Sequence, residues 1–271
     1  MQGLAARPMA SHEPGGAPVA NIKISVINQS TVLKDADVSA AVPALQTQVH
    51  RDFAPAWGTD ADLAFVPAGR QPPAGSWQMI VFDNSDQAGA LGYHDLTQDG
   101  LPLGKVFAQT DLQYGDNWTV TISHELLEML GDPDINLTAF VQQTNTTGRL
   151  YAYEVADACE ADQYGYQING VTVSDFVYPA WFESFRAKGS TQFDYGKHIT
   201  KPYDLLPGGY IGVFDVGSGS GWTQITAQGV AHEYRMRPRV GSRRERRRTP
   251  RDQWLRSNPA KSGPGKGSRK K

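Results

Sequence analysis

The chain of 271 residues contains a single cysteine, Cys159. It can form no intrachain disulfide, and it cannot hold zinc with a cluster of thiolates. Any bound metal ion must therefore be held by His, Asp and Glu side chains. The scarcity of cysteine also suits a reducing compartment.

Long apolar runs are missing as well. A membrane helix needs about 20 mostly apolar residues, and no run in the chain approaches that length. Residues 1–20 contain Pro, Gly and the lone Arg7, without the apolar stretch of a secretion signal, and they predict a disordered leader. We expect no membrane association, and a cytoplasmic location by default.

Charge is distributed unevenly along the chain, although the formal net charge is only −2. Residues 234–271 carry 15 Lys and Arg against 2 acidic residues, a net of +13, and the remainder carries 11 basic and 26 acidic residues, a net of −15. The basic segment has little apolar periodicity and is predicted to be disordered. Two interpretations stay open: it binds nucleic acid or another polyanion, or it is a solvated tail that folds back on the acidic body.

Hydrophobic periodicity predicts an α+β protein. The first part, residues 21–134, holds strands and helices in alternation, and the second, residues 135–233, is a smaller and mostly β subdomain. A helix is expected from Asp35 or Asp37 to Phe53, and a hairpin is expected to turn at Asn169-Gly170. Strands are predicted over residues 22–27, 63–66, 77–82, 90–94, 104–109, 210–216 and 221–226, a helix over 118–130, and a short helix or irregular segment over 176–186.

The most informative motif is His124-Glu125-Leu126-Leu127-Glu128, on the helix predicted over residues 118–130. Residues four apart project from the same helix face, so His124 and Glu128 can reach one metal ion while Glu125 lies beside them. The rest of this helix is largely apolar, which predicts that it is buried. Buried carboxylates need partners, and a metal ion is one such partner.

This H-E-x-x-E motif resembles the H-E-x-x-H helix of the zincin metallopeptidases, with Glu128 in place of the second histidine. Gly131 and Asp134 match the longer zincin motif, whereas the methionine turn is absent because no Met lies between Met129 and Met236. The resemblance covers about residues 22–134. It implies a zincin-like mixed sheet with an active-site helix, followed by the β-rich subdomain, which supplies a downstream ligand. It also implies a metal-dependent peptidase that acts on a peptide or protein, with Glu125 as the general base.

The resemblance implies Zn²⁺ as the cofactor, held by His124, Glu128 and a downstream carboxylate. Glu154, paired with Asp157, is the first candidate for this third position, and Asp157 or Asp134 is the next. Asp157 is alternatively an outer residue that orients a ligand. An extra anionic ligand in place of histidine weakens the Lewis acidity of the ion and shifts preference towards harder divalent ions.

Other residues give weaker predictions. Residues 90–94 are predicted to form an edge strand, either of the kind along which zincins bind extended substrates or an ordinary one. His94 is an additional ligand, a substrate contact or an ordinary surface histidine. Tyr210 is one of several tyrosines that could donate to an oxyanion. A different class of function is also open, in which the fold is a non-catalytic scaffold and the basic segment binds nucleic acid in a phage or nucleoprotein assembly.

Overall fold

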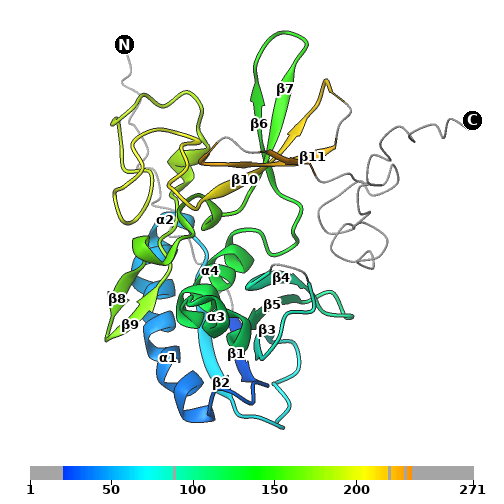
Figure 1. The fold of residues 1–271 in the computed structure, drawn as a ribbon, viewed down its shortest axis with the longest axis vertical. Helices are drawn as coiled ribbons and strands as arrows, with labels where there is room; N and C mark the ends of the chain where they lie inside the picture. Colours follow the sequence, from blue (N-terminus) through cyan, green and yellow to red (C-terminus); the bar gives the residue numbers. More distant parts are fainter. Residues whose placement is uncertain (1–20, 88–89, 219–220, 229–230, 234–271) are drawn as a thin grey trace, which may run out of the picture.

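The computed structural model describes residues 21–87, 90–218, 221–228 and 231–233. The predicted leader and the basic segment 234–271 lie outside this part of the chain. Figure 1 shows two groups of strands with helix α4 between them. Within the described residues no helix has both the length and the hydropathy needed to cross a bilayer.

The first sheet contains five strands in the order β2-β1-β3-β5-β4. Strands β1, β2, β3 and β5 run parallel, and the edge strand β4 pairs antiparallel with β5, so this sheet is mixed. Buried aliphatic residues such as Ile24 and Val26 pack this sheet against the helices. The strands are β1 (Ile22–Asn28), β2 (Ala61–Val66), β3 (Trp77–Phe82), β4 (Gly92–Leu96) and β5 (Pro102–Phe107).

The first helical segment is longer and less regular than predicted. It begins with α1 (Asp35–Thr47), where the Asp37 carboxylate accepts a hydrogen bond from the Lys34 N–H at 2.8 Å. A π-helical turn, Gln48–Phe53, and the short α2 (Ala54–Trp57) follow, so the helix does not stop at Ala54 as expected. The π-turn buries Gln48 and Asp52, whose polar side chains bond to distant parts of the chain.

The second sheet is antiparallel, with strands in the order β12-β11-β10-β7-β6. A separate hairpin, β8–β9, turns at Asn169-Gly170 as predicted, and both residues have positive φ, 51° and 82°. With helices and a mixed sheet before these antiparallel strands, the α+β class is confirmed. The strands are β6 (Thr138–Gln142), β7 (Gly148–Ala152), β8 (Tyr166–Ile168), β9 (Val171–Val173), β10 (Tyr210–Asp215), β11 (Trp222–Thr226) and β12 (Ala231–Glu233).

The sequence left the structure of two segments undecided, and both fold into short irregular elements. The segment after β7 forms neither a continuous helix nor a strand; it folds into two 3₁₀ turns, η2 (Asp157–Cys159) and η3 (Asp162–Tyr164). The segment 176–186 is irregular apart from the 3₁₀ turn η4 (Pro179–Phe182). A helix that was not predicted, α3 (Ala108–Tyr114), directly follows β5.

Helix α4 (Trp118–Gly131) is the central element of the fold. Its N-terminus is capped by Asn117, whose side-chain oxygen accepts a hydrogen bond from the Thr119 N–H. The apolar residues Ile122, Leu126 and Met129 are fully buried in the main core. Most of this helix is therefore enclosed by protein, as its apolar composition predicted.

A buried hydrogen-bond network fixes α4 beside the π-turn. The Ser123 hydroxyl donates to the Gln48 side-chain oxygen at 2.6 Å and accepts from the Ser174 N–H at 2.9 Å. The Gln48 amide in turn donates to the Ser174 carbonyl at 2.8 Å. Three distant segments thus meet one residue before His124, which sets the position of the following turn of α4.

The contact between β10 and η2 depends on a close backbone approach at Gly209. A Cβ added at Gly209 would lie 2.3 Å from the Ala158 carbonyl oxygen, and that backbone atom belongs to η2. We expect Gly209→Ala to lower the free energy of unfolding by about 1–3 kcal/mol, because the two backbones must separate. Chemical denaturation measures this loss.

Gly217→Ala is the matched control, because the nearest atom to its added Cβ is 3.5 Å away, an ordinary van der Waals distance. Its free energy of unfolding should stay within about 0.5 kcal/mol of the parent value. Equal stability of the two variants would contradict the close approach of η2 to β10.

Candidate metal centre

Helix α4 carries three buried ionisable residues, His124, Glu125 and, one turn later, Glu128. They are 6%, 6% and 3% exposed, although charged residues are rarely this buried without partners. The helical spacing brings the His124 ring and the Glu128 carboxylate together, with 3.3 Å between Nε2 and Oε1. The expected juxtaposition of these two side chains is therefore present.

Asp157 completes a first group of possible ligands. Its Oδ1 lies 3.3 Å from His124 Nε2, and it is contributed by the 3₁₀ turn η2. His124, Glu128 and Asp157 each offer one possible ligand atom, and these three atoms lie within 4.8 Å of one another. Two ligand atoms bound at about 2.0–2.2 Å to one tetrahedral ion lie about 3.3–3.6 Å apart. The two distances from His124 Nε2 match this separation.

A second group forms on the other side of Glu128. One atom each from His94, Glu128 and Glu154 also lie within 4.8 Å of one another. His94 comes from the edge strand β4, and its ring lies 3.5 Å from Glu128 Oε2 through Nδ1 and 3.6 Å from Glu154 Oε2 through Nε2. The two downstream carboxylates proposed from the sequence therefore belong to different groups, Asp157 with His124 and Glu154 with His94.

The side chain of Glu125 lies between the backbone of α4 and strand β4, outside both groups. A Cβ added at Gly92 of β4 would lie 2.8 Å from Glu125 Cγ and 2.9 Å from its Oε1, so glycine permits this close approach. Glu125 Oε2 is 3.6 Å from His94 Nδ1, too far for a hydrogen bond, and it has no hydrogen-bond partner among the described residues. The carboxylate thus stands beside the possible ligands without being one of them.

The electrostatics of the first group reflect a shortage of positive charge. Burial acts to lower the pKa of His124, but the neighbouring Glu128 and Asp157 carboxylates outweigh it and raise that pKa well above its usual value. Burial opposes ionisation of Glu128, yet His124 and His94 hold its pKa well below the usual range. Burial and the charge of Glu128 raise the pKa of Asp157 well above its usual value. A cation between these side chains would supply the missing charge.

Two other acidic residues, Asp134 and Glu160, belong to neither group. Asp134, the competing third ligand, is exposed. Glu160 is half-buried one residue beyond η2, and burial raises its pKa to about 7. Glu154, Asp157 and Asp134 were the alternatives for the third ligand of an ion held by His124 and Glu128, and the geometry favours Asp157.

His94 is the residue whose importance the sequence underestimated. It is 0% exposed, and neither of its ring nitrogens has a hydrogen-bond partner among the described residues. The sequence pattern that could have identified His94 is the alternation of β4, in which Gly92 and His94 share the face towards α4. No local spacing links His94 to a helix that begins 24 residues later at Trp118, so only the tertiary fold brings them together.

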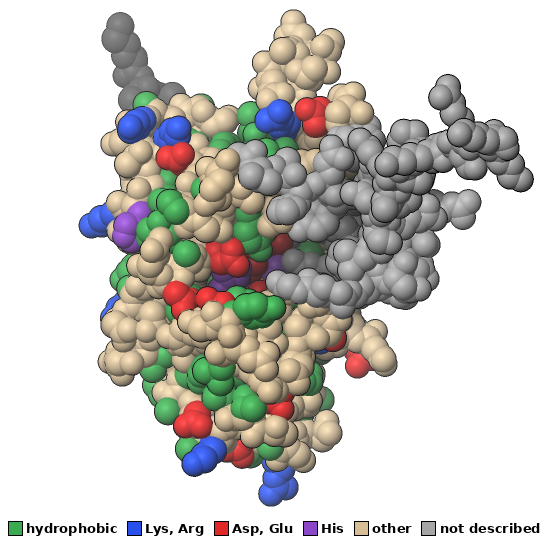
Figure 2. Space-filling view, in the orientation of Figure 1, with side chains coloured by type: hydrophobic (Ala, Val, Ile, Leu, Met, Phe, Trp, Pro, Cys, Tyr) green, Lys and Arg blue, Asp and Glu red, His purple; other side chains and the backbone are tan. Residues whose placement is uncertain are grey.

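The surface over α4 is hollowed and carries acidic and histidine side chains. Figure 2 shows them gathered in the middle of the face, at the height of α4 in Figure 1. Tyr210, the first residue of β10, belongs to the same surroundings, because burial and the Asp157 and Glu160 carboxylates raise its pKa well above the usual value. Its hydroxyl keeps its proton and remains available as a donor.

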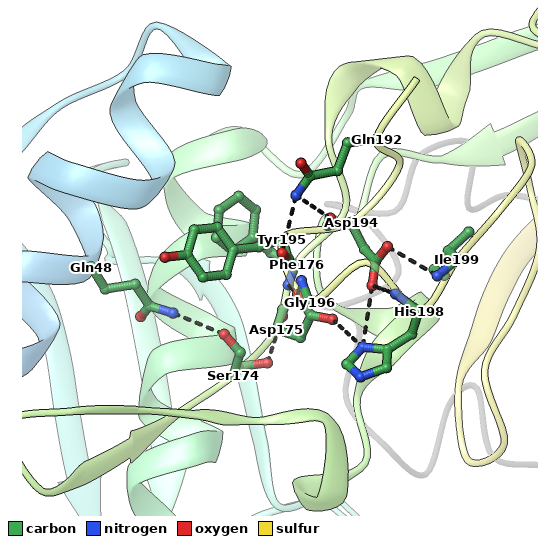
Figure 3. Close-up of polar contacts among 10 residues, drawn as sticks. All are labelled: Gln48, Ser174, Asp175, Phe176, Gln192, Asp194, Tyr195, Gly196, His198 and Ile199. Carbon is green, nitrogen blue, oxygen red and sulfur yellow. Dashed lines mark hydrogen bonds and ion pairs between the residues drawn. The ribbon is translucent and has the colours of Figure 1, made fainter. Parts of the chain in front are cut away.

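A third cluster joins Asp175, Asp194 and His198, and Figure 3 shows their side chains turned toward one another. His198 Nδ1 is 3.4 Å from a carboxylate oxygen of each aspartate. Both carboxylates are fully buried and accept backbone N–H groups: Asp175 from Phe176 and Gly196, and Asp194 from His198 and Ile199. These bonds hold the loop together, so the cluster has a structural explanation.

Comparison of the chain with known proteins finds no matching family model, no matching curated protein and no matching solved structure. The assignment of function therefore rests on the site itself.

The Asp175–Asp194 pair predicts a pH dependence of stability. Burial and the Asp194 charge raise the pKa of Asp175 from 3.8 to about 8. Between pH 3.8 and about pH 8, folding is therefore coupled to the uptake of a proton by Asp175. The protonated carboxyl contributes its full stabilisation below pH 3.8, and this contribution is lost as the pH rises through about 8. We expect Asp175→Asn to remove this loss, because the amide stays neutral throughout.

Urea denaturation at about pH 5 and at about pH 9 measures the effect. The stability of the variant relative to the parent should be greater at the higher pH than at the lower pH, with slopes that differ by up to about 1.4 kcal/mol per pH unit. Identical slopes for the two proteins would show that Asp175 is ionised throughout this range.

Proposed function

We propose that the chain is a metal-dependent hydrolase that cleaves peptide bonds, with Glu125 as its general base. The observation that carries this proposal is the buried group of His124, Glu128 and Asp157 with Glu125 next to it on the same helix. A protein has little reason to bury several carboxylates at ligand distance from histidines unless a cation compensates them.

The three side chains of this group would hold the ion through one nitrogen and two oxygens. A site with three protein ligands leaves a position for water, and a divalent ion there lowers the pKa of that water and polarises a carbonyl group. Two anionic ligands reduce the net charge of the bound ion, so Mn²⁺ and other harder divalent ions are candidates alongside Zn²⁺. The backbone N–H of Ala156 donates to Glu128 Oε1 at 3.3 Å, which helps to orient this carboxylate.

Glu125 is suited to take a proton from water. It follows His124 directly, it is buried, and its Oε2 is not engaged in a hydrogen bond within the described part of the chain. A general base must lie within hydrogen-bond reach of the proton that it accepts, and a position adjacent to the ligands meets this need. The zincin resemblance assigns the same role to this residue.

Strand β4 offers a place for an extended peptide. It is an edge strand of the first sheet, and Gly92, on its α4-facing side, lies against Glu125. A peptide that adds to a sheet edge pairs its backbone with the free N–H and C=O groups of the edge strand. Such a peptide would pass close to the proposed base, and the protonated hydroxyl of Tyr210 is a candidate donor to the developing oxyanion.

The order of elements also supports the proposal. In the first sheet region the chain runs strand, helix, strand, strand, edge strand, strand, the short helix α3 and then α4, an order that is similar to the zincins apart from α3. The alternative, a non-catalytic scaffold whose basic segment binds nucleic acid, depends on residues 234–271, which lie outside the described residues. It stays a prediction.

Glu125→Gln separates an enzyme from a scaffold. We expect the variant to keep its bound metal, because Glu125 belongs to neither ligand group, and to lose about 10²–10⁴-fold in turnover, because an amide cannot accept the proton. Release of peptides from an unfolded, fluorescently labelled protein measures turnover, and elemental analysis measures the metal.

Glu183→Gln is the control, because Glu183 pairs with Arg186 on the surface, apart from the two ligand groups. It should leave both the turnover and the metal content at the parent values. Hydrolysis by the Glu125 variant at the parent rate would exclude Glu125 as the base. A parent protein that binds metal but releases no peptide would favour the scaffold.

A further inference from the structure

The Glu128 carboxylate faces two histidines with its two oxygens. Its Oε1 lies 3.3 Å from His124 Nε2, and its Oε2 lies 3.5 Å from His94 Nδ1. The two imidazoles belong to different ligand groups, and Glu128 is the member that the groups share. A carboxylate in this position is arranged to bridge two ions rather than to complete the shell of one.

His94 gives independent evidence for a second ion. Its ring is fully buried, and its two nitrogens have no hydrogen-bond partner among the described residues, although nearly all buried polar atoms in proteins have one. Glu128 Oε2 lies 3.5 Å from His94 Nδ1, and Glu154 Oε2 lies 3.6 Å from His94 Nε2. Each distance is beyond a good hydrogen bond but matches the separation of two ligands on one ion, about 3.3–3.6 Å. An ion binds only one of the two ring nitrogens, and His94, Glu128 and Glu154 can each offer one ligand atom within 4.8 Å of the other two.

The charge of the two groups taken together also favours a second ion. Glu125, Glu128, Glu154 and Asp157 bring four negative charges when ionised, and all four are at most 6% exposed. A histidine that binds a metal does so as the neutral imidazole, so His94 and His124 then contribute no charge. One divalent cation would leave two charges uncompensated in the interior, whereas two divalent cations balance the cluster.

We propose that the site binds two divalent cations bridged by Glu128. The first is held by His124, Glu128 and Asp157, and the second by His94, Glu128 and Glu154. This proposal rests on the proposed function for the first ion and extends it, because paired ions about 3.5–4 Å apart can stabilise both the attacking and the leaving atoms of a displacement. It also gives Glu154 and His94 a role that a single-ion site leaves unexplained.

The number of bound ions tests the proposal directly. The purified full-length protein is stripped with a chelator, reloaded with Zn²⁺ and desalted, and the zinc is measured by elemental analysis. We expect two ions per chain for the parent protein and one for His94→Asn. Because His94 is buried and its variant can fail to fold, Glu154→Gln provides a second test, with affinity for the second ion about 10–100-fold weaker.

His198→Asn is the matched control, because His198 belongs to the third histidine-containing group, in the Asp175 loop. It should leave the count at two, and a fall to one would place the second ion in that loop and overturn the proposal. One ion in the parent protein that His94→Asn does not remove would also overturn it, while leaving the proposed function intact. Zero ions in the parent protein would contradict both.

Loading with Mn²⁺ gives a readout that does not depend on counting. Two Mn²⁺ ions bridged by a carboxylate couple magnetically, so the electron paramagnetic resonance spectrum of the parent protein should show a spin-coupled pair. His94→Asn should show isolated Mn²⁺. A spectrum of isolated ions in the fully loaded parent protein would refute the bridge by Glu128.

Discussion

The burial of four carboxylates around two imidazoles is the constraint on which the rest of the structure depends. Burying a charge without a partner costs several kcal/mol, and these side chains are at most 6% exposed. The cost requires compensation by protons or by cations, and the surroundings raise the pKa of both His124 and Asp157, which favours the protonated form of each. A divalent cation satisfies this demand and the ligand distances together.

Several features of the fold serve to hold this cluster in place. The Ser123 hydroxyl links α4 to Gln48 and Ser174 immediately before His124. Glycine at position 92 lets β4 lie against Glu125, and glycine at position 209 lets β10 approach η2, which carries Asp157. The ligands therefore come from α4, from an edge strand and from the segment after β7.

Local patterns predicted much of the fold. Alternation identified the strands of the first sheet, the helical spacing of His124 and Glu128 placed both on one face, and Asn169-Gly170 marked its hairpin. These features depend on interactions between neighbours in sequence. The choice between Glu154 and Asp157 was not accessible in the same way, because the segment after β7 breaks into 3₁₀ turns and its residues follow neither helical nor strand periodicity. His94 was undervalued because its contacts with Glu128 and Glu154 arise only when β4 pairs with β5 beneath α4.

The central claim is that a cation compensates the buried carboxylates, and the stability of the protein with and without that cation tests it most directly. The free energy of unfolding is measured for the purified full-length chain, for the same chain after removal of metal with a chelator, and after addition of excess Zn²⁺ or Mn²⁺. We expect removal to lower the free energy of unfolding, and readdition of an ion at about 1,000 times its dissociation constant to restore about 4 kcal/mol. A protein that contains no metal as purified, and whose stability neither the chelator nor the added ions change, would contradict the account.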